Sequence, residues 1–168
     1  MCTGFAYLIK TMCDLKEIEC EIINGYGRTT KNNIYSLDTP NHSWNAVKLN
    51  GKWYLSDAVW ASGKVVDGIH IKNYHKGYFL TAPELFAKNH YPFEKQWFLN
   101  DSISNLEFKP ETIMYAQTFD KQILPIVPMD LETKVKKNKV VHFKFKKLKN
   151  QTFKTIQLIY FSDQDERV

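Results

Sequence analysis

An imidazole, a carboxylate and a thiol in the N-terminal part of this 168-residue chain are of the types that carry out acyl transfer. The imidazole of His42 and the carboxylate of Asp57 fall on the two arms of a predicted β-hairpin, Trp44–Leu49 and Lys52–Val59. These arms flank Asn50-Gly51, and Asn-Gly between two strand-like runs favours a two-residue type I′ turn. The geometry of this hairpin therefore decides how near the two side chains lie.

A two-residue turn fixes the register of the hairpin, because Leu49 must then face Lys52. In this register Trp44 faces Asp57, and His42 is a diagonal neighbour of Asp57 on the same face, with backbone positions about 7–8 Å apart. The same face carries aromatic and aliphatic side chains, so we expect it to be buried, and a buried carboxylate is costly unless it is paired. His42 is the predicted partner, and an imidazole bonded to a carboxylate has a fixed tautomer and a raised basicity.

The thiol of Cys2 is the candidate nucleophile. A helix over residues 3–14 is predicted from apolar residues at helical spacing, namely Phe5, Leu8, Ile9 and Met12. Cys2 lies just before or at the first turn of this helix, where the helix dipole and free N–H groups favour a thiolate and where its own N–H could contribute to an oxyanion hole. Taken singly, an ordinary N-terminal thiol, a core histidine and a strand-end carboxylate are the alternatives.

The other elements of the first hundred residues are predicted from turn residues and apolar patterns. A strand over Glu19–Tyr26 precedes a loop over 28–41, and a second long loop covers 61–76. Thr81-Ala82-Pro83-Glu84 has the pattern of a capping box and predicts a short helix to about Lys88. The aromatic segment Tyr91–Leu99 is expected to cover the core.

After Asp101 the pattern becomes β-rich. We expect a core domain over residues 1–100 and a β-rich C-terminal appendage over 107–168, with strands at Ile113–Phe119, Lys134–Lys137, Val140–Lys147 and Thr152–Phe161. The lysines between 134 and 149 contribute to a net charge of +5 and suggest an anionic partner as one interpretation. Alternation of apolar residues with lysines favours the other, a half-buried strand with one solvated face.

Several motifs in one order resemble the transglutaminase-like superfamily, in the branch that contains kyphoscoliosis peptidase and its bacterial relatives. The motifs are Cys2-Thr3-Gly4-Phe5-Ala6-Tyr7-Leu8, Cys13 with Ile18-Glu19-Cys20, Gly25-Tyr26, His42-Ser43-Trp44-Asn45-Ala46-Val47, Gly51-Lys52-Trp53-Tyr54-Leu55-Ser56-Asp57-Ala58-Val59-Trp60, Tyr78-Phe79-Leu80-Thr81 with Pro83-Glu84, His90-Tyr91-Pro92 and Trp97. The resemblance covers about residues 2–100. Papain-like enzymes proper are disfavoured, since their cysteine and histidine lie about 130–150 residues apart.

The resemblance implies an α+β, papain-like transglutaminase core, with an N-terminal helix carrying the cysteine and an antiparallel sheet carrying the histidine and aspartate, followed by a sandwich-like appendage. It makes Cys2 the nucleophile, His42 the general base and Asp57 the orienting acid. The implied reaction forms a thioester from a protein or peptide amide and resolves it with water, favoured here, or with an amine. It also implies that the segment usually preceding the cysteine is missing, and the alternative function is an inactive interaction module.

Composition excludes several other classes. Hydrophobic residues make up 43% and charged residues 24% of the chain, as in globular domains, and no apolar run approaches the length of a membrane span. Cys13 and Cys20 are expected to be core thiols, and His70, His75 and His90 have no metal-ligand spacing and are expected on loop surface. We therefore expect no metal, cofactor or nucleic-acid partner. The compartment is not predicted.

Overall fold

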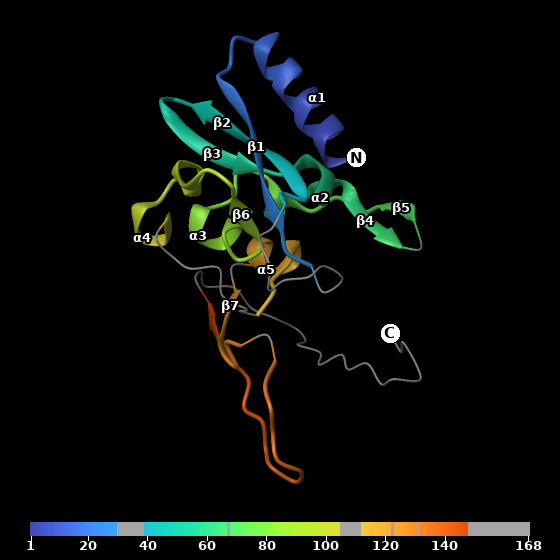
Figure 1. Cartoon of the computed structure of the whole chain (residues 1–168), viewed down its shortest axis with the longest axis vertical. Helices are drawn as coiled ribbons and strands as arrows, with labels where there is room; N and C mark the ends of the chain where they lie inside the picture. Colours follow the sequence, from blue (N-terminus) through green and yellow to red (C-terminus); the bar gives the residue numbers. More distant parts are fainter. Residues whose placement is uncertain (30–38, 67, 105–111, 122, 131, 148–168) are drawn as a thin grey trace.

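The computed structural model describes residues 1–29, 39–66, 68–104, 112–121, 123–130 and 132–147 of the chain (Figure 1). In chain order the elements are α1 (Cys2–Asp14), β1 (Cys20–Gly27), β2 (His42–Leu49), β3 (Lys52–Ser56), α2 (Ala58–Ser62), β4 (Gly63–Val66), β5 (Ile69–Lys72), η1 (Lys76–Tyr78), α3 (Pro83–Phe86), β6 (His90–Pro92), η2 (Lys95–Phe98), α4 (Asp101–Ser104), α5 (Ala116–Lys121), β7 (Ile123–Val127) and β8 (Lys144–Lys147). The mixture of helices with antiparallel strands is compatible with the expected α+β class.

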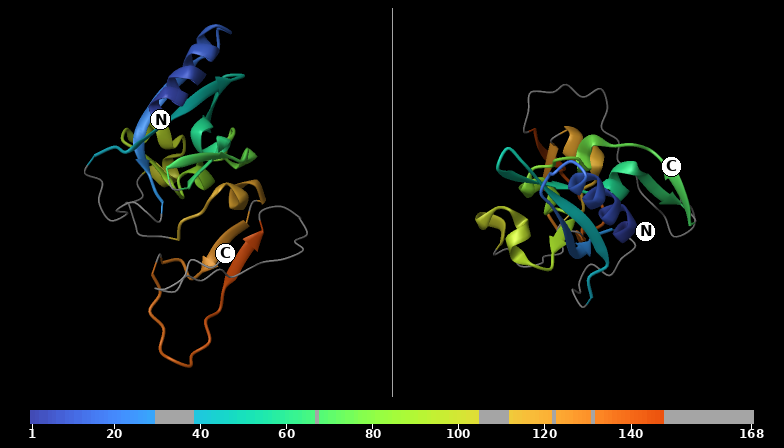
Figure 2. Two further views of the ribbon diagram at one scale, coloured as in Figure 1. Left: turned by 90° about the vertical axis from the view of Figure 1, so that its right-hand side faces the viewer. Right: turned by 90° about the horizontal axis from the view of Figure 1, so that it is seen from above.

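The main sheet has the strand order β3-β2-β1-β6, and each neighbouring pair is antiparallel. Helix α1 lies along this sheet against β1 and β2, and its N-terminal end lies close to α2 (Figures 1 and 2). The buried Asn45 side chain of β2 donates a hydrogen bond to the carbonyl oxygen of Ala6 at 3.0 Å. This bond attaches the helix to the sheet and so fixes the position of the helix end that carries Cys2.

The central hairpin has the predicted register. Leu49 faces Lys52 and Ala46 faces Leu55. The turn residues have the positive φ angles that a type I′ turn requires, 50° at Asn50 and 76° at Gly51.

The second arm of the hairpin is shorter than predicted. Strand β3 ends at Ser56, and the predicted pairing of Trp44 with Asp57 is wrong because the chain turns into α2. Asp57 is the N-cap of that helix, and its side chain accepts a hydrogen bond from the backbone N–H of Trp60 at 3.0 Å. Sequence alternation could not reveal this change, because Asp57 also continues the strand pattern.

Helix α1 packs through only part of the predicted stripe. Leu8 and Met12 are 56% and 55% exposed, whereas Ala6 is buried and Phe5, Ile9 and Cys13 are half-buried. Only one side of the helix contacts the sheet, and apolar residues also occur beside it. Apolar spacing alone therefore could not identify the side that is packed. Cys20 is buried, as expected of a core thiol, whereas Cys13 is only half-buried.

Three local predictions in residues 61–88 differ from the structure. The loop predicted over 61–76 contains the hairpin β4–β5. The predicted capping box is wrong, since Ala82 is the N-cap of α3 and Thr81 Oγ1 donates instead to the carbonyl oxygen of Gly77 at 2.6 Å. The helix itself is shorter than predicted, ending at Phe86.

The C-terminal predictions are corrected in several places. The strand predicted over Ile113–Phe119 is largely the helix α5, and Lys134–Lys137 is not a strand. Strand β8 pairs with β7, but its residues are all exposed, so the half-buried face predicted for Val140–Lys147 is wrong. The predicted strand Thr152–Phe161 lies outside the described residues.

The hydrophobic core lies between the main sheet and the short helices beyond it. Its buried members are Ile23, Trp44, Ala46, Leu55, Ala61, Tyr78, Leu85, Phe86, Met114, Ala116 and Phe119. This core surrounds one end of β2, where the candidate site is located. The division at residues 100 and 107 stays a prediction.

Candidate active site

His42 and Asp57 are in direct contact. The Nε2 atom of His42 lies 2.6 Å from Oδ2 of Asp57, and both side chains are buried. His42 is the first residue of β2, and Asp57 follows the last residue of β3, so the hairpin brings them together although Asp57 is not in the sheet. Because Nε2 faces the carboxylate, Nδ1 is the ring nitrogen that remains for another partner.

Asp57 is held as an ionised carboxylate. Its Oδ1 atom accepts from the N–H of Trp60, and its own backbone N–H donates to the carbonyl oxygen of Tyr78 at 2.9 Å. Burial raises the pKa of this carboxyl, but hydrogen bonds from His42 and His90 more than offset that effect and hold the pKa well below its usual range.

Cys2 is near enough to His42 for each side chain to shift the pKa of the other. Burial raises the pKa of the half-buried Cys2 thiol, but the hydrogen bond and positive charge of His42 and a backbone hydrogen bond from Ser43 lower it below its ordinary value on balance. In return, burial lowers the pKa of His42, while Asp57 and then Cys2 raise it above its ordinary value. Both shifts favour a thiolate–imidazolium pair.

His90 also contacts Asp57, contrary to the expectation that it lies on loop surface. Its Nε2 atom is 3.0 Å from Oδ2 of Asp57, and the residue is 1% exposed. On its other side, Nδ1 lies 2.7 Å from Oδ1 of Asn89, which is fully buried. No motif spacing relates these residues to Asp57, which precedes His90 by 33 positions.

The two histidines meet over the central strand β1 because that strand has glycines beneath them. His42 of β2 pairs with Gly25, and His90 of β6 pairs with Gly27, so all four residues share one face of the sheet. A Cβ atom at Gly27 would lie 3.1 Å from the His42 ring. Gly25 lies in the predicted strand and Gly27 directly after it, and these two glycines are the signal that could have located this approach.

Aromatic rings enclose both imidazoles. The ring centroid of His42 lies 4.9 Å from that of Trp60, and the ring of Phe86 stacks on His90 at 3.9 Å. These rings limit the access of water to the His42–Asp57 contact and restrict the orientations that both imidazoles adopt.

The group His42, Asp57 and His90 is the one set of potential metal ligands that the described residues bring together, with donor atoms within 4.8 Å of one another. The Nε2 atoms of both imidazoles are already bonded to Oδ2 of Asp57. The arrangement is satisfied by hydrogen bonds and needs no ion to explain it.

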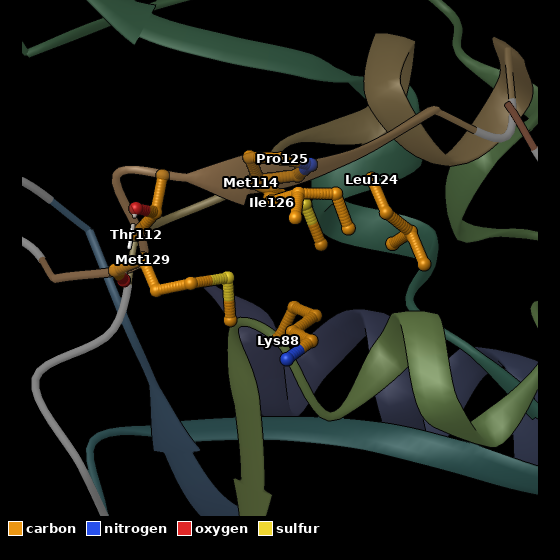
Figure 3. A pocket seen from close by; sticks show the side chains of 7 residues that line it. All are labelled: Lys88, Thr112, Met114, Leu124, Pro125, Ile126 and Met129. Carbon is orange, nitrogen blue, oxygen red and sulfur yellow. Dashed lines mark hydrogen bonds between the residues drawn. The ribbon is translucent and has the colours of Figure 1, made fainter. Parts of the chain in front are cut away.

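His70, His75 and a small cavity lie apart from this group. His70 Nε2 lies 3.1 Å from the hydroxyl oxygen of Ser62, and His75 is half-buried just before η1. A small cavity of about 130 Å³ lies beside β7 (Figure 3), and its lining is Lys88, Thr112, Met114, Leu124, Pro125, Ile126 and Met129. It contains none of the three predicted site residues.

Comparison with known proteins identifies relatives of the chain. Human kyphoscoliosis peptidase is 35% identical over 136 residues, which cover 76% of this chain and 20% of that protein. The mouse kyphoscoliosis peptidase is 33% identical over the same length. The LIM and transglutaminase domain protein ltd-1 of Caenorhabditis elegans is 28% identical over 148 residues, 79% of this chain and 20% of that protein.

The chain belongs to the transglutaminase-like superfamily.

This transglutaminase-like chain spans about a fifth of the length of the curated relatives it matches. No protein-family profile matches it. Among the described residues of this transglutaminase-like chain, no helix is both long enough and apolar enough to cross a membrane.

Proposed function

We propose that this transglutaminase-like chain transfers acyl groups from protein or peptide amides through a thioester on Cys2, with hydrolysis favoured over transfer to an amine. His42 is the acid and base, and Asp57 orients it. The single observation that carries the proposal is the His42–Asp57 contact of 2.6 Å. Cys2 is near enough to this imidazole for each group to shift the pKa of the other. The membership of the superfamily supports the proposal independently.

The first half of the proposed reaction uses the thiolate–imidazolium pair. The sulfur of Cys2 attacks the carbonyl carbon of the amide, and the imidazolium gives its Nδ1 proton to the leaving nitrogen as the carbon–nitrogen bond breaks. The products of this step are an amine and a thioester on Cys2. Asp57 retains its negative charge throughout and holds Nε2–H, which keeps the correct nitrogen directed at the sulfur.

The second half regenerates the thiolate. The neutral His42 removes a proton from water, the resulting hydroxide attacks the thioester, and the carbon–sulfur bond breaks to release a carboxylic acid. The thiolate and the imidazolium are then restored. A primary amine in place of water would give a new amide by the same proton transfers.

The start of α1 is the proposed site for the oxyanion formed in both halves. The first N–H groups of an α-helix have no acceptor within the helix, and the positive end of the dipole lies there. The backbone N–H of Cys2, the first residue of α1, is therefore a donor close to the carbon that the sulfur attacks. We also propose the papain-like arrangement of the superfamily for this helix and sheet.

A peptide-turnover assay tests the proposal. Glutamine-containing peptides are incubated with the 168-residue chain in isotope-labelled water, with and without a primary amine, and the products are analysed by mass spectrometry. Labelled carboxylate indicates hydrolysis, and an amine adduct indicates transfer. Cys2→Ser and His42→Ala should abolish both products, whereas Cys13→Ser should retain them.

Unchanged turnover in the His42→Ala variant would contradict the proposed function. Absence of turnover in a folded chain whose Cys2 reacts like a free thiol would favour the alternative, a transglutaminase-like module that only binds partners.

A further inference from the structure

The buried His90 is unexplained by a Cys–His–Asp mechanism. Its imidazole lies 3.0 Å from the same carboxylate oxygen that His42 contacts, and its ring is 5.5 Å from the His42 ring between centroids. A buried polar side chain with no role beyond packing is costly, so its hydrogen bonds indicate what it does.

The protons on His90 follow from the donors and acceptors around it. Asn89 Nδ2 donates to the carbonyl oxygen of Met114 at 2.6 Å and contacts the hydroxyl of Tyr78 at 2.9 Å, which fixes the orientation of the Asn89 amide. Its Oδ1 atom therefore faces His90 Nδ1, and oxygen of a primary amide only accepts. Nδ1 of His90 must carry a proton.

Nε2 of His90 also faces an acceptor. Oδ2 of Asp57 is ionised and only accepts, so the contact of 3.0 Å requires a proton on Nε2. Burial opposes a charged ring and outweighs the hydrogen bond to Asp57, so the pKa of His90 is lowered to about 4 on balance. A neutral ring, however, leaves one of its two nitrogens facing an oxygen lone pair in a dry site, and this repulsion decides for the protonated form.

We propose that His90 is a positioning residue of the site: it carries protons on both ring nitrogens, donates Nε2–H to Asp57, and keeps this carboxylate in place and balanced in charge while His42 gains and loses its own proton. The inference rests on the proposed function for its role in turnover. Its hydrogen-bond geometry does not depend on that function.

The balance of charge gives the physical reason. With Cys2 as thiolate and His42 as imidazolium, the buried Asp57 would leave one negative charge uncompensated, and a second imidazolium cancels it. When His42 becomes neutral in the acyl-enzyme, His90 still compensates Asp57. The titratable groups that face His90 are Asp57 from the β3–α2 junction, His42 from β2 and Tyr78 from η1.

The first test is nitrogen NMR of the full chain labelled in its histidine side chains. At neutral pH we expect both ring nitrogens of His90 to have shifts of the protonated type, with the signals assigned by their loss in His90→Gln. A nitrogen of the unprotonated type at neutral pH would overturn the proposal. The shifts are measured on the unmodified chain, and the variant serves only to assign the signals.

The second test compares two matched variants by the pH dependence of Cys2 alkylation with iodoacetamide. The amide nitrogen of His90→Gln reaches the position of Nε2 and keeps the donor to Asp57, whereas that of His90→Asn reaches the position of Nδ1 and loses it. We expect His90→Asn to slow alkylation at pH 6 by about tenfold, since a hydrogen bond to a charged group is lost. His90→Gln keeps the donor but removes the positive charge, so its alkylation rate should lie between those of the unmodified chain and His90→Asn. Equal profiles for the unmodified chain and His90→Asn would overturn the proposal.

Alkylation and NMR also separate this inference from the proposed function. If no amide is turned over but His90→Asn changes the pH dependence of Cys2 alkylation, the proposed function fails and the role of His90 stands. If amides are turned over at unchanged rate and with an unchanged pH profile in His90→Asn, the function stands and the role of His90 fails.

Discussion

Replacing Asp57 with asparagine removes one acceptor atom and the negative charge from a carboxylate that accepts three hydrogen bonds. Oδ2 contacts the imidazoles of His42 and His90 at 2.6 and 3.0 Å, and Oδ1 accepts from Trp60 N–H at 3.0 Å. An amide has one acceptor oxygen, so in either orientation its NH₂ group faces at least one N–H donor. We expect the oxygen to remain on the imidazole side, because the opposite orientation opposes two donors.

Even in the better orientation, the hydrogen bond of His42 is no longer made to a charged group. Hydrogen bonds to charged groups contribute about 1.5–3 kcal/mol and neutral ones about 0.5–1.5 kcal/mol, a difference of about 1–1.5 kcal/mol, or about one unit in the pKa of His42. A lower pKa of His42 weakens the thiolate–imidazolium pair. The Cys2 thiol should then ionise, and react with iodoacetamide, at a pH about one unit higher.

Peptide mass mapping of all three cysteines after timed alkylation measures this shift. Asp14→Asn is the matched control, since it removes a carboxylate from the helix that carries Cys2, at an exposed ion pair with Lys10. The control should leave the Cys2 profile in place. A folded Asp57→Asn variant with the profile of the unmodified chain would refute the argument that the carboxylate supports the pair.

Three further predictions concern the packing around the site. Gly25→Ala should destabilise the fold by about 2 kcal/mol or more in urea unfolding, because the added Cβ would lie 2.3 Å from a backbone oxygen of β6. As the control, Gly4→Ala has nothing within 4 Å of the added Cβ and should stabilise α1 by about 0.5–1 kcal/mol. Equal effects of the two substitutions would contradict the close approach of β6 to Gly25. Burial first, and then Cys13, raises the pKa of Cys20 to about 12, so Cys20 should be alkylated slowest below pH 8 and rapidly only in urea. Phe86→Ala should lower the free energy of unfolding by about 3–5 kcal/mol in the same assay, because Phe86 is buried. Phe93 is 65% exposed, so Phe93→Ala should lower it by less than about 0.5 kcal/mol.

The hairpin could be predicted because its signals are local. Asn50-Gly51 fixes the turn, the turn fixes the register, and the register brings His42 to the same region as Asp57. The contact forms although the predicted strand continues too far, because a residue that follows the strand and begins a helix stays close to the strand end. The local signals therefore predicted the His42–Asp57 contact correctly, but they assigned Asp57 to a strand where it begins a helix.

The position of His90 could not be predicted because it depends on long-range pairing. Strand β6 has three residues, too few for any alternation of side chains to be recognised, and it pairs with β1 more than sixty positions earlier in the chain. The same limit explains α5, where the apolar run around Phe119 fits a strand or a helix equally well and tertiary packing decides.

Asp57 links the assembly of the site to the start of α2. One carboxylate caps the helix through Oδ1 and binds two imidazoles through Oδ2, so each interaction fixes the plane in which the others are made. An N-cap contributes about 1 kcal/mol, which is small beside the desolvation of a buried charge, so the cap alone does not account for an ionised aspartate at this position. The two imidazoles provide the compensation that the cap cannot, and they do so from strands on either side of β1. Formation of the complete β2-β1-β6 sheet is therefore a condition for the Cys2–His42 pair to form, and loss of the β6 pairing should abolish the reactivity of Cys2 even where the hairpin that holds His42 remains intact.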